Sequence, residues 1–168
     1  MISFRPLTDN DAGRLLLWMS SPHVRQWWVN EGQTAEDAVE DALAYIGAAN
    51  ATAWLFEWNG KPAGYTQSYE CHPDHEPGSP CHSDSPKGTF LIDMFIGDAS
   101  LLGEGIGTQV LTQISNGMFK KGALCVRVAP QTANLAAMRC CEKAGFVSVG
   151  LTPCGGLALM QRTPELNA

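Results

Sequence analysis

The stretch that decides the fold lies between residues 102 and 108 and reads Leu102-Gly103-Glu104-Gly105-Ile106-Gly107-Thr108. It follows a run of strand-forming residues at 89–96 and precedes apolar residues that recur every four positions, a spacing typical of a helix. Glycines let the backbone approach a ligand closely, and the first turn of a helix presents free N–H groups. A glycine loop that opens a helix is therefore a candidate phosphate site.

Two common phosphate-binding motifs do not fit this loop. The dinucleotide fingerprint requires Gly-x-Gly-x-x-Gly, and its last glycine would fall on Thr108 or Val110. The Walker loop requires a lysine before a serine or threonine, and the loop contains none. What remains is a Gly-x-Gly loop at a helix start, which by itself is also compatible with a simple turn.

Composition and charge restrict the class of protein. The chain has 168 residues, of which 45% are hydrophobic, so we expect one domain spanning residues 1–168. The net charge of -6 disfavours nucleic acid and anionic membranes as partners. No apolar stretch reaches the roughly 20 residues of a membrane-spanning helix, and the N-terminus has no signal pattern. We therefore expect a cytoplasmic monomer or homodimer, in which disulfides among the six cysteines are not expected.

The remaining sequence predicts a mixed sheet with helices on both faces. Strands are expected at 2–5, 53–58, 63–69, 89–96, 124–128, 146–151 and 157–161, and helices at 8–19, 34–47, 106–122 and 132–144. The dipeptide Asn59-Gly60 predicts a hairpin between the second and third strands. Three strands precede the first β-α-β unit, which excludes a doubly wound alternation.

A second motif follows the glycine loop. It reads Asn134-Leu135-Ala136-Ala137-Met138-Arg139-Cys140-Cys141-Glu142-Lys143-Ala144-Gly145-Phe146. The pairing of Gly-x-Gly with Asn-x-x-Ala and then Glu-Lys-x-Gly-Phe resembles the GNAT superfamily, most closely the aminoglycoside 6'-N-acetyltransferases. The similarity extends from Phe4 to about Met160. Its other matching positions are Trp18, His23, Trp27-Trp28, Asn59-Gly60-x-Pro62, Gly64-Tyr65-x-Gln67-Ser68-Tyr69 and Ile92-Asp93.

This resemblance implies a fold and an activity. The fold is of the α+β class, with a central mixed and mostly antiparallel sheet of six to seven strands and about four flanking helices. The activity is transfer of an acetyl group from acetyl-CoA, the co-substrate, to a primary amine of a small cationic acceptor that is aminoglycoside-like or polyamine-like. The donor residues are implied by position. The backbone of Met94, Phe95 and Ile96 should bind the pantetheine arm, residues 102–108 should cradle the pyrophosphate, and Asn134 should contact CoA.

Acyl transfer to an amine requires a neutral nitrogen, because an alkylammonium with a pKa of roughly 10.4 is not nucleophilic. Asp93 matches the aspartate of the related enzymes' Ile-Asp pair and is the candidate base, acting directly or through water. An aspartate in this place could equally be paired to a neighbouring group for structural reasons. Related enzymes often place a tyrosine, the acid for the CoA thiolate, where this chain has Cys141. Either Cys141 donates the proton, or it is a core residue and water does so.

The acceptor side departs from the resemblance. The aminoglycoside enzymes carry an Asp-Pro pair after the fifth strand, with the aspartate facing the drug, and this chain has Ala129-Pro130. The loss of a carboxylate makes other amines, or a hydroxylamine-bearing siderophore precursor, more plausible acceptors. The residues expected to line the acceptor cleft are Trp28, Tyr65, Gln67, Tyr69 and Asp93.

Residues 70–88 form the most unusual segment, predicted as a long exposed loop. Cys71, His72, His75, Cys81 and His82 lie within 12 residues, but their spacing matches no standard zinc pattern, so no metal is expected. An acceptor-side lid is the preferred interpretation. Three alternatives to the acetyltransferase stay open, namely a non-catalytic CoA-binding protein, an acyltransferase on a hydroxylamine, and a metal-responsive module built on this Cys/His loop.

Overall fold

The structure is a computed structural model that describes residues 1–72, 74, 79–81, 85–152 and 155–165. Its elements are β1 (Ile2–Pro6), η1 (Asp9–Asp11), α1 (Ala12–Ser20), α2 (Pro22–Trp28), α3 (Ala35–Leu43), β2 (Ala51–Trp58), β3 (Lys61–Glu70), β4 (Thr89–Ile96), η2 (Ala99–Leu101), α4 (Ile106–Lys120), β5 (Cys125–Val128), α5 (Leu135–Lys143), β6 (Val147–Leu151) and β7 (Ala158–Arg162). They form two compact units. Unit 1 comprises Met1–Ser68 with Met94–Ile106, and unit 2 comprises Tyr69–Asp93 with Gly107–Ala168.

The strands follow the order β1-β2-β3-β4-β5-β7-β6. The pairs β1–β2, β5–β7 and β6–β7 are antiparallel, and β4–β5 is parallel. A mixed sheet of seven strands confirms the expected fold class. The described residues contain five α-helices, one more than the sequence predicted. The expectation of one domain over residues 1–168 stays a prediction.

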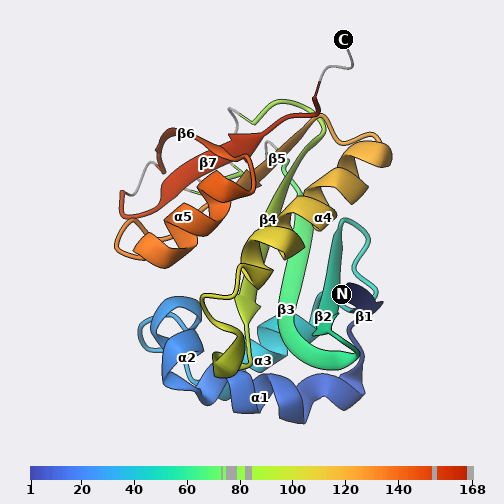
Figure 1. The fold of residues 1–168 in the computed structure, drawn as a ribbon, viewed down its shortest axis with the longest axis vertical. Coiled ribbons are helices and arrows are strands. Elements are labelled where there is room, and N and C mark those ends of the chain that lie inside the picture. Colours follow the sequence, from blue (N-terminus) through green and yellow to red (C-terminus); the bar gives the residue numbers. More distant parts are fainter. Residues whose placement is uncertain (73, 75–78, 82–84, 153–154, 166–168) are drawn as a thin grey trace. The chain divides into compact units, whose positions relative to one another are not determined.

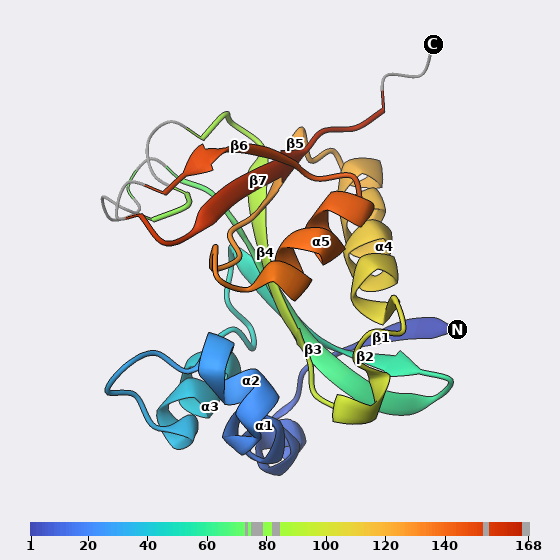
Figure 2. The same cartoon turned by 60° about the vertical axis from the view of Figure 1, so that its left-hand side comes forward.

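The extra helix is α2, at a place where the sequence predicted only a helix end. Proline closes α1 as expected, because Ser20 is the last residue of α1. Pro22 then occupies the first turn of a new seven-residue helix, where the N–H that proline lacks would have had no partner. In Figures 1 and 2, α1, α2 and α3 group together at one end of β2 and β3.

The core of unit 1 lies between these helices and the strands. Helix α3 begins where its capping box predicts, because the Thr34 hydroxyl accepts from the Asp37 N–H and the Asp37 carboxylate accepts from the Thr34 N–H. Its apolar side then joins a buried cluster with α1, β2 and β3. The buried members are Leu7, Leu15, Trp18, Met19, Val24, Ala35, Ala38, Val39, Ala42, Ala53, Leu55, Tyr65 and Phe95.

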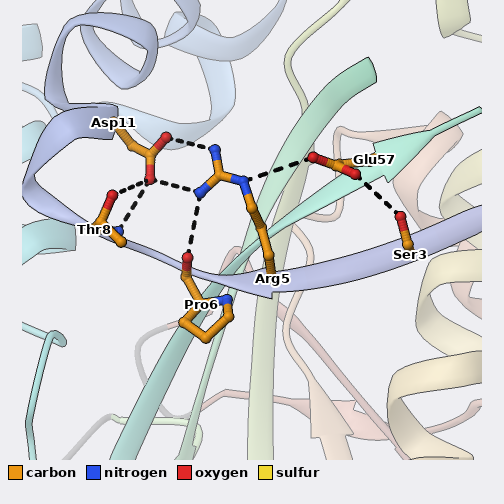
Figure 3. Close-up of polar contacts among 6 residues, drawn as sticks. All are labelled: Ser3, Arg5, Pro6, Thr8, Asp11 and Glu57. Carbon is orange, nitrogen blue, oxygen red and sulfur yellow. Dashed lines mark hydrogen bonds and ion pairs between the residues drawn. The ribbon is translucent and has the colours of Figure 1, made fainter. Parts of the chain in front are cut away.

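A polar network ties β1 to the turn that follows it (Figure 3). Arg5 donates through both terminal nitrogens to the Asp11 carboxylate, at 2.8 and 2.7 Å, and its Nε lies 3.6 Å from Glu57. Asp11 also accepts from the N–H and the hydroxyl of Thr8. The Arg5 side chain, followed by the Thr8 donors, holds the pKa of Asp11 down to about 2 although burial opposes this.

This network predicts a pH dependence of stability. The folded pKa of Asp11 lies below the unfolded value of roughly 3.9, so its contribution is present above pH 4 and is lost as the pH falls toward 2. We expect Asp11→Asn to lower the free energy of unfolding by about 1–2 kcal/mol at pH 7, since Arg5 is partly exposed and solvent screens the pair. Urea unfolding from pH 7 to pH 2 measures this, and the difference from the unchanged protein should shrink at the acid end. Asp9→Asn removes an exposed carboxylate of the same turn that makes none of the contacts in Figure 3, so an equal loss there would refute this assignment.

Unit 2 contains the first residues of β4, the strands β5, β6 and β7, and the helices α4 and α5. Helix α4 and helix α5 run side by side in Figures 1 and 2. The Thr108 hydroxyl in the first turn of α4 donates to the Cys140 carbonyl in α5 at 3.4 Å. Asn134 caps α5, which is why this helix begins at Leu135 and not at residue 132 as predicted. The final strands pair antiparallel, as expected from the sequence.

The cysteines of the 70–88 segment overturn one expectation. Cys71 and Cys81, whose Cα atoms are 4.7 Å apart, form a disulfide. The prediction of no disulfides rested on compartment and chain length, and it was wrong because Cys71 and Cys81 lie close enough in space to be bonded. The Cys71 N–H donates to the Thr89 carbonyl, and Cys81 is completely buried. Buried Arg127 holds the returning part, donating to the Pro80 carbonyl and to the Ser85 hydroxyl.

Candidate active site

Strand β4 carries the predicted base, and its bounds match the prediction. Its parallel register with β5 pairs Thr89 with Cys125 and ends with Leu91 opposite Arg127, whereas β4 itself continues to Ile96. Asp93 follows this paired part and is half-buried. Only the first residues of β4 therefore pair with β5, and the residues expected to bind pantetheine lie beyond this paired part.

An aromatic cluster occupies unit 1 beside the end of β4. The Trp28 ring lies edge-on to Phe95, with ring centroids 4.8 Å apart, and to Tyr65 at 5.7 Å. Tyr65 is fully buried and donates its hydroxyl to Gln67 Oε1 at 2.8 Å. The structure thus brings together three residues predicted for the acceptor cleft. Tyr65 supports Trp28 and Gln67 from within the core, while these two remain half-buried.

The same end of β4 makes two contacts that sequence reasoning missed. His23 Nε2 lies 3.0 Å from the Ile96 carbonyl oxygen. Gly97 is packed so closely that a Cβ added there would lie 2.2 Å from the Trp18 indole. Both Trp18 and His23 belong to the matching positions of the resemblance, but no local pattern assigns them a role. Their partners are more than 70 residues away in sequence, as the separation of 73 between His23 and Ile96 shows.

The glycine loop has the backbone that its sequence predicts. Gly103 and Gly105 adopt positive φ angles of 81° and 73°, a region that favours glycine. A Cβ at either position would meet nothing within 4 Å, so the glycines serve backbone conformation and not close packing inside the protein. Helix α4 begins directly afterwards at Ile106, which presents its first N–H groups at the end of the loop.

The start of α5 supplies the second predicted donor element. Asn134 is half-buried, and its side-chain oxygen accepts from the Ala137 N–H at 3.1 Å. This bond caps the helix and fixes the orientation of the side chain. Because an amide oxygen is used for the cap, the NH₂ group is the part of the side chain suited to donate to an anionic ligand.

Cys141 lies on the buried side of α5. Only 5% of the residue is exposed, and burial, followed by the charges of Cys140 and Glu142, raises the pKa of its thiol to about 12. An unperturbed cysteine thiol has a pKa of roughly 8.5, well below this value. Proton transfer from Cys141 to a CoA thiolate would therefore run uphill, which favours the second of the two roles considered for this residue.

Tyr69 and Ala129 belong to unit 2, where they pack with the disulfide. The cluster consists of Cys71, Cys81 and Leu91, with Tyr69 and Ala129 against it. Cys71 and Cys81 have no thiolate to offer a metal while they are bonded to each other, and His75 and His82 lie outside the described residues. Among the residues that the structure describes, no group of three or more His, Cys, Asp or Glu side chains could hold a metal ion. None of the helices among the described residues has the length and apolar character that a membrane span requires.

A mixed seven-stranded sheet, with a glycine loop opening α4 and a capped α5 after β5, defines an acetyltransferase fold and not a dinucleotide-binding one. Residues 8–152 match the acetyltransferase (GNAT) domain family, and the chain therefore belongs to the GNAT family of acetyltransferases.

Named relatives agree with this assignment. The chain is 30% identical over 170 residues to an aminoglycoside N(6')-acetyltransferase type 1 of Klebsiella pneumoniae, covering 98% of this chain and 84% of that protein. Among solved structures, aminoglycoside acetyltransferase AAC(6')-Ib in complex with coenzyme A is 30% identical with a TM-score of 0.84, covering 98% of this chain and 96% of that chain. The same enzyme with paromomycin and acetyl-CoA is 29% identical with a TM-score of 0.84, covering 99% of both chains.

Proposed function

We propose that this protein is an N-acetyltransferase that moves an acetyl group from acetyl-CoA to a primary amine of a small cationic acceptor. The observation that carries the proposal is similarity along 98% of the chain to enzymes named for this reaction, one of them solved with coenzyme A. The conformation of Gly103 and Gly105 at the start of α4 supports a bound pyrophosphate, because it places free helix N–H groups next to an open glycine backbone.

The donor residues are those that the resemblance assigned. Residues 102–108 cradle the pyrophosphate, Asn134 donates to CoA, and the backbone of Met94, Phe95 and Ile96 binds the pantetheine arm. The parallel pairing of β4 with β5 ends at Leu91, which supports the last assignment because β4 runs on to Ile96. A cytoplasmic location goes with this proposal, since acetyl-CoA is an intracellular metabolite.

The chemistry is direct transfer. Asp93 takes the proton of the acceptor ammonium, directly or through water, and the neutral nitrogen attacks the thioester carbonyl. The carbon–sulfur bond breaks, CoA leaves as a thiolate, and the nitrogen gives its second proton to water as the amide forms. The high pKa and burial of Cys141 support protonation of this thiolate by water instead of by Cys141.

The acceptor class is an aminoglycoside-like or polyamine-like amine. Trp28 and Gln67 are its proposed contacts, with Tyr65 fixing both, and Tyr69 is a further proposed contact. Ala129 packs in an apolar cluster with the disulfide, so this position offers no carboxylate to a polycation. That observation keeps the hydroxylamine acceptor as a second candidate, because such a precursor carries fewer positive charges than an aminoglycoside.

An acceptor screen tests the proposal. Purified full-length protein is incubated with acetyl-CoA and aminoglycosides, polyamines, peptides or hydroxylamines, and release of free CoA thiol is followed. We expect at least one amine to raise thiol release at least about tenfold above hydrolysis without acceptor, a modest part of the acceleration that enzymes give. Acetyl-CoA should also raise the melting temperature, while NADH and ATP should not. Binding of acetyl-CoA without acetylation of any amine would favour the non-catalytic alternative, and no binding would exclude both.

A further inference from the structure

Three side chains of α1 and α2 hold three consecutive residues at the end of β4. The Trp28 ring packs edge-on against the Phe95 ring, His23 contacts the Ile96 carbonyl, and the Trp18 indole covers Gly97. All of these residues belong to unit 1. Two of the three held residues, Phe95 and Ile96, are among those proposed to bind pantetheine through their backbone.

Both polar groups of the peptide bond between Ile96 and Gly97 are occupied. Its N–H donates to the Ala63 carbonyl of β3 at 2.8 Å, and its C=O lies 3.0 Å from His23 Nε2. A carbonyl oxygen only accepts, so His23 donates, and its Nε2 carries the proton. The plane of this peptide is therefore fixed from two sides, by β3 and by α2.

We propose that His23 is a positioning residue for the donor, holding the end of β4 in the orientation in which its backbone binds the pantetheine arm of acetyl-CoA. This inference rests on the proposed function. Without the histidine donor, the Ile96 carbonyl turns toward water or another donor, and the peptide planes before it lose their fixed orientation. His23 itself does not touch the reacting atoms in this proposal.

Two polar substitutions of similar character separate this role from a general packing role. Glutamine places an amide N–H near the position of the histidine Nε2, whereas asparagine is one carbon shorter and does not reach the Ile96 carbonyl. We expect His23→Asn to weaken acetyl-CoA binding about five- to tenfold, the effect of one lost hydrogen bond. His23→Gln should bind acetyl-CoA within about threefold of the unchanged protein by the same arithmetic.

The control ligand is 3'-phospho-ADP. It contains the pyrophosphate of CoA but no pantetheine. Calorimetric titration of both ligands against both variants should show that 3'-phospho-ADP binds each variant within about twofold of the unchanged protein, as expected where no contact is altered. The KM for acetyl-CoA should rise in His23→Asn more than kcat falls.

Other results would overturn the assignment. Equal weakening of both ligands in His23→Asn would show a structural role, as would weakening of acetyl-CoA that glutamine does not rescue. No change with either variant would show that the contact is dispensable. If the unchanged protein binds 3'-phospho-ADP but not acetyl-CoA, the proposed function fails and the role of His23 fails with it, whereas unaltered acetyl-CoA binding in His23→Asn of a protein that does transfer the acetyl group overturns the role of His23 alone.

Discussion

Replacing Asp93 by asparagine is expected to lower kcat by about 10²–10⁴-fold at pH 7, the usual contribution of a general base. Asparagine keeps the size of the side chain but cannot accept the ammonium proton. The Kd of acetyl-CoA should change little, because the proposed donor contacts are made by the backbone of β4 and by the glycine loop. Steady-state thiol release, with the best acceptor of the screen, measures kcat.

The pH dependence of this variant makes the test sharper. Below its pKa of roughly 10.4, an amine gains about tenfold in neutral fraction for each unit by which the pH rises. The activity of Asp93→Asn should therefore climb about tenfold per unit between pH 7 and 9, because solvent then supplies the neutral amine. Asp98→Asn is the matched control, as Asp98 is exposed and accepts from the Ser100 N–H and hydroxyl. A kcat of Asp93→Asn within threefold of the unchanged protein would rule out a base at this position.

The second large effect is expected from Gly64→Ala. A Cβ at Gly64 in β3 would lie 2.2 Å from Phe56 Cζ and 2.3 Å from the Phe95 carbonyl oxygen. The ring can turn, but the carbonyl belongs to the backbone of β4 and can move only with the strand. We expect a loss of at least about 3 kcal/mol in the free energy of unfolding, at the upper end for overpacking. For a chain of this size the melting temperature should fall by about 6–12 °C.

Gly117→Ala gives the matched control for this substitution. Gly117 lies inside α4, and a Cβ there would meet nothing within 4 Å. Alanine is the better helix former by about 0.5–1 kcal/mol, so this variant should be as stable as the unchanged protein or more stable. If Gly64→Ala melted within 2 °C of the control, the close approach of β3 and β4 backbones described here would be incorrect.

Local signals predicted much of the fold. The Asn59-Gly60 hairpin forms with positive φ at both residues, β4 has its expected bounds, and Thr34 caps α3. Helix α2 was missed because a proline is compatible both with the end of one helix and with the first turn of the next. Pro22 does both here, and only the apolar contacts of Val24 and Trp28 with the core reveal that a second helix begins.

Less of the candidate site than of the fold could be predicted from the sequence. The roles of Asp93, the glycine loop and Asn134 came from matching positions in a family, and they stay predictions. Burial of Tyr65 and Cys141 depends on which neighbours the fold supplies, and residue type does not reveal it. The contact of His23 with Ile96 and the pairing of Cys71 with Cys81 are tertiary events, since each joins groups that no local periodicity relates.

The disulfide also changes the covalent topology of the chain. Residues 71–81 form a closed ring, so a single cut by a protease between the two cysteines opens the ring without separating the protein into two pieces. The two fragments would part only after a thiol reductant is added and the chain is unfolded. After such a cut, the unfolded protein therefore has a single mass when Cys71 and Cys81 are bonded and two smaller masses when they are reduced.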